Sequence, residues 1–430
     1  MDNYIVFLPS PASSTALSES LGALEALNVE PEYDRAFNRE REFFAYAHNV
    51  FNRVTAHRPS VRVFAEAEAA GSLSAMSEAT AEEANSLTDE SILPSLQAFI
   101  AQLERAEAER LRSLGANVIQ DFEIPFDAPE IEPENVEPLS NAWHLEKINV
   151  TAARNKELTG SGVLVGVLDT GIDASHPEFA GKEIHFAEFS RDGKIISTTA
   201  RDAGDHGTHV CGTIAGRTLG VAPDADLAVA CVLNQIGLNG RLTTQFSVIV
   251  KAIDWLQRTD FDGRSVAVVN ASLGGRGYIS DLYGAVQTIR NVSNIGLIAA
   301  IGNLGERGVD NHGSPANYDV SLAVGNTDAQ DNVNPSSDWG TVAEHNGLQK
   351  PELSAPGTSI LSSIPGGGFG RMTGTSMASP CVAGAAALLI QQDPTLADDV
   401  DRLFGRLKAL TVPLADRARA GVGRLDLTGV

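Results

Sequence analysis

Residues 162–173 of this chain read GVLVGVLDTGID, an apolar run that ends at Asp169 and continues into a glycine turn. Helix-like segments, residues 243–258 and 281–294 among them, alternate with further short apolar runs. Those runs are DLAVACVL (226–233), VAVVNASLGG (266–275), IGLIAAIGN (295–303) and VSLAVGN (320–326). Runs of this length are typical of strands buried on both faces. The alternation predicts an α/β fold, a doubly wound and mostly parallel sheet with helices on both faces, whose functional groups gather beyond the carboxyl ends of the strands.

The chain upstream has a different composition and predicts a smaller, helix-rich N-terminal region over residues 1–139, followed by the α/β domain over residues 140–430. Two stripes of apolar residues at helical spacing predict helices in this region, the second continuing to a stop at Gly115. The stripes are Tyr33, Phe37, Phe44 and Phe51, and Leu96, Phe99, Ile100 and Leu103. Residues 126–141, FDAPEIEPENVEPLSN, are rich in proline and acids and predict an exposed linker.

Charge and composition exclude several classes of partner. The formal net charge of -23 argues against nucleic acid, because phosphate contacts need clustered Lys and Arg. No apolar run reaches about eighteen residues, so no membrane span is expected. The first residues, MDNYIVFLPSPASS, lack the pattern of a secretory signal, so we expect a cytoplasmic protein. In that compartment the cysteines Cys211, Cys231 and Cys381 are expected to be reduced core thiols.

Three polar residues lie at predicted strand ends or helix starts. Asp169 ends the first apolar run, His206 opens the small-residue segment HGTHVCGTIAG, and Ser376 lies at the start of GTSMASPCVAGAAALL. A serine hydroxyl is a weak nucleophile that needs a base, a histidine supplies one near neutral pH, and a carboxylate orients the histidine. The chain order Asp, His, Ser differs from the orders in nucleophile-elbow hydrolases and chymotrypsin-type proteases. The three residues predict nucleophilic hydrolysis by a serine.

These motifs resemble those of the subtilisin-like serine proteases, or subtilases. The segments around Asp169, His206 and Ser376 match in family order, and so do NASLGG, IAAIGN, LGVAPDADL and ELSAPGTSI, over roughly residues 143–423. The resemblance implies that Asp169 is the orienting acid, His206 the general base and Ser376 the nucleophile. It implies that Asn303 is the side-chain donor of the oxyanion hole. It also implies a set of substrate-binding residues, namely Ser272, Leu273 and Gly274 as a backbone edge, Phe246 and Ile249 around an apolar pocket, and Gly313 in the main specificity pocket.

The sequence departs from the family at two places. Only Arg217 and Thr218 separate GTIAG from LGVAP, where members with a strong calcium site have a longer loop. We therefore expect no cofactor, and calcium stays open as the alternative. A zinc site from His206, His209, Asp205 and Cys211 is disfavoured, because a helical zinc pair needs histidines four residues apart. Cys381 replaces a histidine that relatives often have, and it is expected, like Cys211, to be a buried and unreactive thiol.

The N-terminal region resembles a subtilase prosegment in two stretches, YIVFLP (4–9) and LGANVIQDFEIP (114–125), while the helical stretch between them favours an accessory domain. We therefore expect intramolecular inhibition by this region, with the linker passing by or through the cleft. The predicted function is that of a serine endopeptidase acting on protein or peptide substrates. Two alternatives stay open: a protease dedicated to maturing one precursor, and a catalytically silent binding protein on a protease fold.

Overall fold

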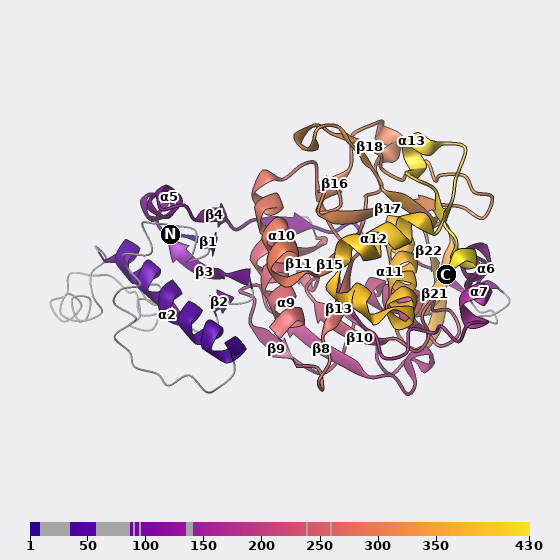
Figure 1. Ribbon diagram of the computed structural model, residues 1–430, viewed down its shortest axis with the longest axis horizontal. Coiled ribbons are helices and arrows are strands. Elements are labelled where there is room, and N and C mark those ends of the chain that lie inside the picture. The colour runs from indigo at the N-terminus through magenta and orange to yellow at the C-terminus, as the bar shows by residue number, and fades with distance from the viewer. Residues whose placement is uncertain are drawn as a thin grey trace. The chain divides into compact units, whose positions relative to one another are not determined.

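The computed structural model describes residues 1–8, 35–56, 87–88, 91–93, 96–134, 141–237, 240–258 and 260–430. The chain divides into two compact units, residues 1–122 and 123–430 (Figure 1). This division falls earlier than the predicted boundary between residues 139 and 140. The reason is that residues 123–134 form two short strands that pair with strands of the second unit.

The described part of the first unit contains an antiparallel sheet and two helices. The sheet has the order β2-β3-β1-β4, and its elements are β1 (Asp2–Phe7), β2 (Ile92–Leu93), β3 (Ala98–Leu103) and β4 (Asn117–Gln120), with helices α2 (Arg35–Thr55) and α5 (Arg105–Ser113). The predicted helix around Phe44 and Phe51 is confirmed by α2, although Tyr33 lies outside the described residues. Strands β1 and β4 form where the two prosegment-like stretches were identified.

The helix predicted from Leu96 to Leu103 is wrong, because residues 98–103 are strand β3. Phe99 and Leu103 fit a helical stripe, but together with Ala101 they also fit the two-residue period of a strand, and all three are buried. Pairing of β3 with β1 along its whole length decides between the two patterns. The helix begins only at Arg105, and Gly115, with φ of +89°, follows its end as expected.

A ten-stranded sheet forms the centre of the second unit (Figure 1), in the order β23-β24-β20-β17-β15-β13-β7-β10-β8-β9. All neighbouring pairs from β24 to β8 are parallel, and only the edge strands β23 and β9 are antiparallel. The predicted doubly wound, mostly parallel sheet is therefore confirmed. Its strands are β7 (Leu164–Asp169), β8 (Ile184–Phe189), β9 (Ile195–Ser197), β10 (Asp226–Cys231), β13 (Val266–Ala271), β15 (Gly296–Ala300), β17 (Ser321–Thr327), β20 (Leu353–Pro356), β23 (Thr411–Val412) and β24 (Arg424–Leu425).

Alternate side chains of these strands face helices on opposite sides. Val268 and Ile298 belong to the core that contains α8 and α11, whereas Val269 and Leu297 lie against α9 and α10. Helix α11 is buried from Thr375 to Ile390 and packs on α8 and on five strands of the large sheet, so it forms the centre of its layer. The helices are α6 (Trp143–Lys147), α7 (Val150–Arg154), α8 (His206–Ala215), α9 (Phe246–Arg258), α10 (Ser280–Ser293), α11 (Thr375–Gln392), α12 (Val400–Ala409) and α13 (Arg417–Ala420).

Short strands surround the carboxyl edge of the large sheet. They form three-stranded sheets β11-β12-β5 and β21-β22-β6 and the pairs β14-β16 and β18-β19. Their bounds are β5 (Glu123–Pro125), β6 (Glu132–Glu134), β11 (Gln235–Ile236), β12 (Leu242–Gln245), β14 (Gly275–Arg276), β16 (Gly313–Ser314), β18 (Gly340–Val342), β19 (Leu348–Lys350), β21 (Ile360–Ile364) and β22 (Gly368–Met372). Of the helices in the described part of the chain, none combines the length and the apolar character needed to cross a bilayer.

Candidate active site

Asp169 and His206 meet where strand β7 ends and helix α8 begins. His206 Nδ1 lies 2.8 Å from Asp169 Oδ1, and both side chains are buried, with 1% and 0% of their surface exposed. The same carboxylate oxygen accepts the Thr170 amide at 2.7 Å. This buried contact, together with the Thr170 amide on the same carboxylate, fixes the ring position and identifies Nδ1 as the nitrogen directed at the carboxylate.

A hydrogen-bonded network holds the two backbone segments together. Asp202 accepts the Thr170 hydroxyl on Oδ1 at 2.6 Å, and the Thr208 amide and hydroxyl on Oδ2 at 2.7 and 2.6 Å. Thr170 in turn accepts the Gly207 amide at 2.8 Å. Asp202 therefore joins the turn after β7 to the first turn of α8, where it satisfies amides that have no partner within the helix.

Ser376 is the second residue of α11, and its hydroxyl is directed at the end of β13. Its Oγ lies 3.4 Å from the Ser272 carbonyl oxygen, and Ser272 Oγ donates to the Ser376 carbonyl at 3.0 Å. Asn270 accepts the Ser379 hydroxyl at 2.6 Å and donates to Ser272 Oγ at 3.0 Å. These bonds fix the start of α11 against the sheet. His206 Nε2 is buried and has no hydrogen-bond partner among the described residues, Ser376 included.

Asn303 lies beside the start of α11. Its Oδ1 accepts the Thr375 amide at 2.9 Å and the Thr375 hydroxyl at 3.1 Å. With Oδ1 doubly engaged, Nδ2 is the end of the carboxamide that can donate to a bound group. A Cβ built on Gly374 would lie 3.3 Å from Nδ2, so the glycine keeps the space beside this donor open.

A buried carboxyl supports the Asn303 segment from behind. Asp338 is 1% exposed, accepts the Leu304 amide at 2.8 Å, and donates its own amide to the Gly302 carbonyl at 3.0 Å. Burial raises the pKa of Asp338 to about 7, although Arg276 and Arg307 and the Leu304 amide act in the opposite direction. The position of Asn303 is therefore linked to a group that titrates near neutrality.

The other predicted substrate-binding residues lie around the same edge of the sheet. Phe246 and Ile249, at the start of α9, are 1% and 7% exposed, and Leu273 is 5% exposed. These residues and Ser272 and Gly274 follow β12 or β13, and their place around a substrate pocket stays a prediction. A Cβ on Gly313 would lie 2.6 Å from the Gly275 carbonyl oxygen. Close pairing of β16 with β14 therefore requires glycine there, and its role in a specificity pocket stays a prediction.

The residue that sequence reasoning missed is Phe126. Its ring lies edge-on to the His206 imidazole with the ring centroids 4.9 Å apart, and its amide donates to the Leu242 carbonyl at 2.9 Å. Strand β5 precedes it and pairs antiparallel with β12, with Ile124 opposite Thr244. The linker interpretation overlooked a signal, because the apolar residues Ile124 and Phe126 are separated by one residue, which is the period of a strand.

Two thiols and one further histidine near the site, Cys211, Cys381 and His209, are not reactive centres. Cys211 and Cys381 are fully buried, and burial raises the pKa of both thiols, that of Cys381 to about 12. Such thiols stay protonated. His209 lies 2.9 Å from the Ile360 carbonyl oxygen through Nε2, and burial lowers its pKa to about 3.

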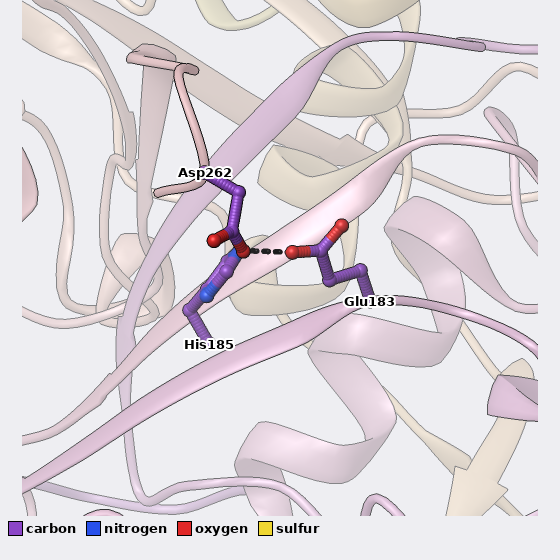
Figure 2. A group of neighbouring side chains, drawn as sticks. All are labelled: Glu183, His185 and Asp262. Carbon is purple, nitrogen blue, oxygen red and sulfur yellow. Dashed lines mark ion pairs between the residues drawn. The ribbon is translucent and has the colours of Figure 1, made fainter. Parts of the chain in front are cut away.

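One group within the described ranges has the composition of a metal site. Figure 2 shows the side chains of Glu183, His185 and Asp262 directed toward one another, with their nearest ligand atoms within 4.8 Å. They lie at the amino ends of β8 and β13, whereas Asp169 lies at the carboxyl end of β7. Arg264 contacts both Glu183 and Asp226 at 2.5 Å, so part of the local negative charge is already balanced.

Comparison with known proteins points to one family. Residues 160–426 match the family model described as the subtilase family, Peptidase_S8. Subtilisin DY of Bacillus licheniformis is 37% identical over 274 residues, which cover 62% of this chain and 90% of that protein. An intracellular serine protease of Paenibacillus polymyxa is 34% identical over 297 residues, covering 66% of this chain and 85% of the relative. Among solved structures, the crystal structure of a cold-adapted subtilisin-like serine proteinase matches with 31% sequence identity and a TM-score of 0.50. The match covers 63% of this chain and 88% of that chain.

Proposed function

This chain belongs to the subtilase family and is a serine endopeptidase, and from this premise we propose that Asp169, His206 and Ser376 form its catalytic triad. The observation that carries the proposal is the 2.8 Å contact between Asp169 Oδ1 and His206 Nδ1. Because Nδ1 is committed to the carboxylate, Nε2 is the nitrogen left to exchange a proton with substrate and nucleophile.

In the proposed mechanism the Ser376 proton passes to His206 Nε2 as Oγ attacks the scissile carbonyl carbon. The long 3.4 Å contact of Ser376 Oγ with the Ser272 carbonyl is then exchanged for one with the imidazole. Asp169 stabilises the imidazolium that forms, in a site from which water is largely excluded. His206 next donates the proton to the leaving amine. In the second half of the reaction His206 takes a proton from the attacking water and returns it to Ser376 Oγ as the acyl-enzyme is hydrolysed.

The negative charge that develops on the carbonyl oxygen needs donors that are already in place. Asn303 Nδ2 is our candidate for the side-chain donor, supported by the two Thr375 bonds that fix its carboxamide. Amides at the start of α11 supply further donors, because the first amides of a helix have no partner within it. Fixed donors of this kind lower the barrier because they need no reorganisation during the reaction.

We also propose that substrate binds as an extended strand between β12 and the backbone of Ser272, Leu273 and Gly274, with Phe246 and Ile249 around an apolar pocket. The pairing of β5 with β12 supports this binding mode. A narrower activity, the maturation of one precursor, is a second candidate. It is favoured because the chain's own residues 123–125 already pair with β12.

Residues 123–134 are proposed to inhibit the enzyme until they are displaced or cut. Phe126 covers the His206 ring, and β6 pairs antiparallel with β22, which lies shortly before Ser376 in the chain. Arg371 and Glu134 strengthen the second attachment with an ion pair at 2.8 Å. The segment between β5 and β6 is therefore anchored at both of its ends, next to His206 at one end and on the strand that precedes Ser376 at the other. A cytoplasmic location and a metal-free mechanism remain parts of this proposal.

Digestion of a denatured protein by the purified full-length chain tests the proposed function. The parent chain should degrade the protein and a Ser376→Ala chain should not, with Ser161→Ala, at an exposed position before β7, as the matched control that retains activity. Equal digestion by the parent and the Ser376→Ala chain would show that another residue is the nucleophile. Cleavage at one sequence only, in a peptide library, would favour the dedicated processing protease over a general endopeptidase.

A further inference from the structure

Two arginines, one directly before β12 and one in β14, converge on one carboxylate in the segment that covers His206. Arg241 Nη1 contacts Asp127 Oδ1, and Arg276 Nη2 lies 3.5 Å from Asp127 Oδ2. Arg241 directly precedes β12, and Arg276 is the second residue of β14. The chain carries 55 acidic residues against 32 Lys and Arg. Two arginines on one carboxylate are therefore a local excess of positive charge in an acidic protein.

The register of β5 fixes where that carboxylate lies. Pro125 is opposite Thr243, Ile124 is opposite Thr244, and the Phe126 amide donates to the Leu242 carbonyl. Ile124 and Phe126 are 2% and 7% exposed, while Pro125 and Asp127 face solvent. Asp127 is therefore the residue that directly follows the side chain packed on His206.

We propose that Arg241 and Arg276 form a subsite that selects an acidic side chain in the substrate, directly after the residue that packs on His206. This inference rests on the proposed function, in which the substrate binds as a strand along β12. A peptide bound there in the register of residues 123–126 presents its next side chain to both guanidinium groups. The substrate class is then a peptide with apolar residues at the positions of Ile124 and Phe126, and Asp or Glu one residue later.

The two guanidinium groups suit a carboxylate, and their exposure to solvent determines how strongly Asp or Glu is preferred over a neutral amide. Arginine offers several fixed donors that match the two oxygens of Asp or Glu. Both arginines are more than half exposed, Arg241 at 57% and Arg276 at 61%, so water and salt weaken the interaction. We expect a carboxylate to be favoured over its neutral amide by roughly five- to tenfold at low ionic strength, and by less at high ionic strength.

The test compares two internally quenched peptides. One has the linker sequence FEIPFDAPEIEP, and the other has the same sequence with Asn in place of Asp. The full-length chain is used, and the measured quantity is the ratio of the two kcat/KM values. This ratio is independent of the fraction of enzyme whose cleft is open, because that fraction multiplies both values. The parent should favour the Asp peptide by roughly five- to tenfold, Arg241→Gln and Arg276→Gln should each reduce the ratio, and the double variant should bring it near one.

Arg217→Gln is the matched control. Arg217 is exposed and follows the far end of α8, about 15 Å from His206 along the helix axis. The ratio should stay at the parent value in this variant and should fall in all chains as salt is added. A parent ratio near one, or a ratio that neither active-site arginine changes, would overturn the acid-binding subsite.

A second measurement does not need catalysis. In a Ser376→Ala chain, Asp127→Lys should speed hydrogen exchange at the Phe126 amide, because the lysine faces two positive charges, while Glu130→Lys, an exposed position in the same segment, should not. Unchanged exchange in Asp127→Lys would contradict the subsite. Failure of the proposed function can be distinguished from failure of the subsite. In that case neither peptide would be hydrolysed, while Asp127→Lys could still speed exchange at the Phe126 amide.

Discussion

Replacement of Asp338 by asparagine tests whether the Asn303 segment rests on a protonated carboxyl. The buried Asp338 has a pKa of about 7, against 3.8 for an ordinary aspartate, so the folded protein holds a proton there that the unfolded chain releases. Between about pH 4 and pH 7 the folded state binds more protons, and this contribution to stability is lost as the pH rises through that window. A difference of about three pKa units lowers the free energy of unfolding by about 4 kcal/mol at pH 8. This value is the upper bound of the stability that a neutral asparagine at this position should restore.

Urea unfolding at pH 5, 6, 7 and 8 measures this effect, in a Ser376→Ala background that prevents self-digestion. Asp338→Asn keeps an oxygen for the Leu304 amide, so it should exceed the parent in stability by about 1–2 kcal/mol at pH 5 and by up to about 4 kcal/mol at pH 8. Asp398→Asn, at an exposed position, is the control and should follow the parent at every pH. Parallel curves for the parent and Asp338→Asn would refute the assignment of the raised pKa to this carboxyl.

Other consequences are open to direct measurement. Asn303→Leu should lower kcat by roughly 10²–10³ with little change in KM, a magnitude taken from removal of one such donor in a subtilisin; steady-state kinetics with an unchanged kcat would exclude Asn303 from the oxyanion hole. Phe126→Ala should raise the initial peptidase rate of the full-length chain, because it uncovers His206, and a slower or unchanged initial rate would argue against inhibition by this segment. Iodoacetamide at pH 8 should leave both activity and the mass of the chain unchanged, since Cys211, Cys231 and Cys381 are all buried and burial raises the pKa of each thiol; alkylation of any of them in the folded protein would contradict this.

The large sheet could be predicted from sequence because its strands are buried on both faces. Runs such as residues 164–169 and 226–231 contain almost nothing but apolar residues, and such runs are unambiguous when helices separate them. Asp169, His206 and Ser376 could be selected as candidates for a related reason, since each lies at an element boundary next to glycine and small residues that permit close packing. Local sequence therefore determined these features.

Features that depend on long-range pairing could not be predicted in the same way. Residues 98–103 fit both a helical stripe and a strand, and only the partner β1 decides between them. The convergence of Arg241 and Arg276 on Asp127 joins three segments that are far apart in the chain, and no local pattern marks it. The buried Asp338 is likewise an ordinary aspartate in sequence, and only the packing around it gives the carboxyl a pKa near 7.

The most direct test of the catalytic assignment is labelling by a fluorophosphonate, followed by mass mapping of the modified residue. We expect the label on Ser376 in the parent chain and in Phe126→Ala, and a labelling rate reduced by orders of magnitude in His206→Ala. A label on another residue, or an equal rate on Ser376 without His206, would contradict the proposal that these two side chains act together.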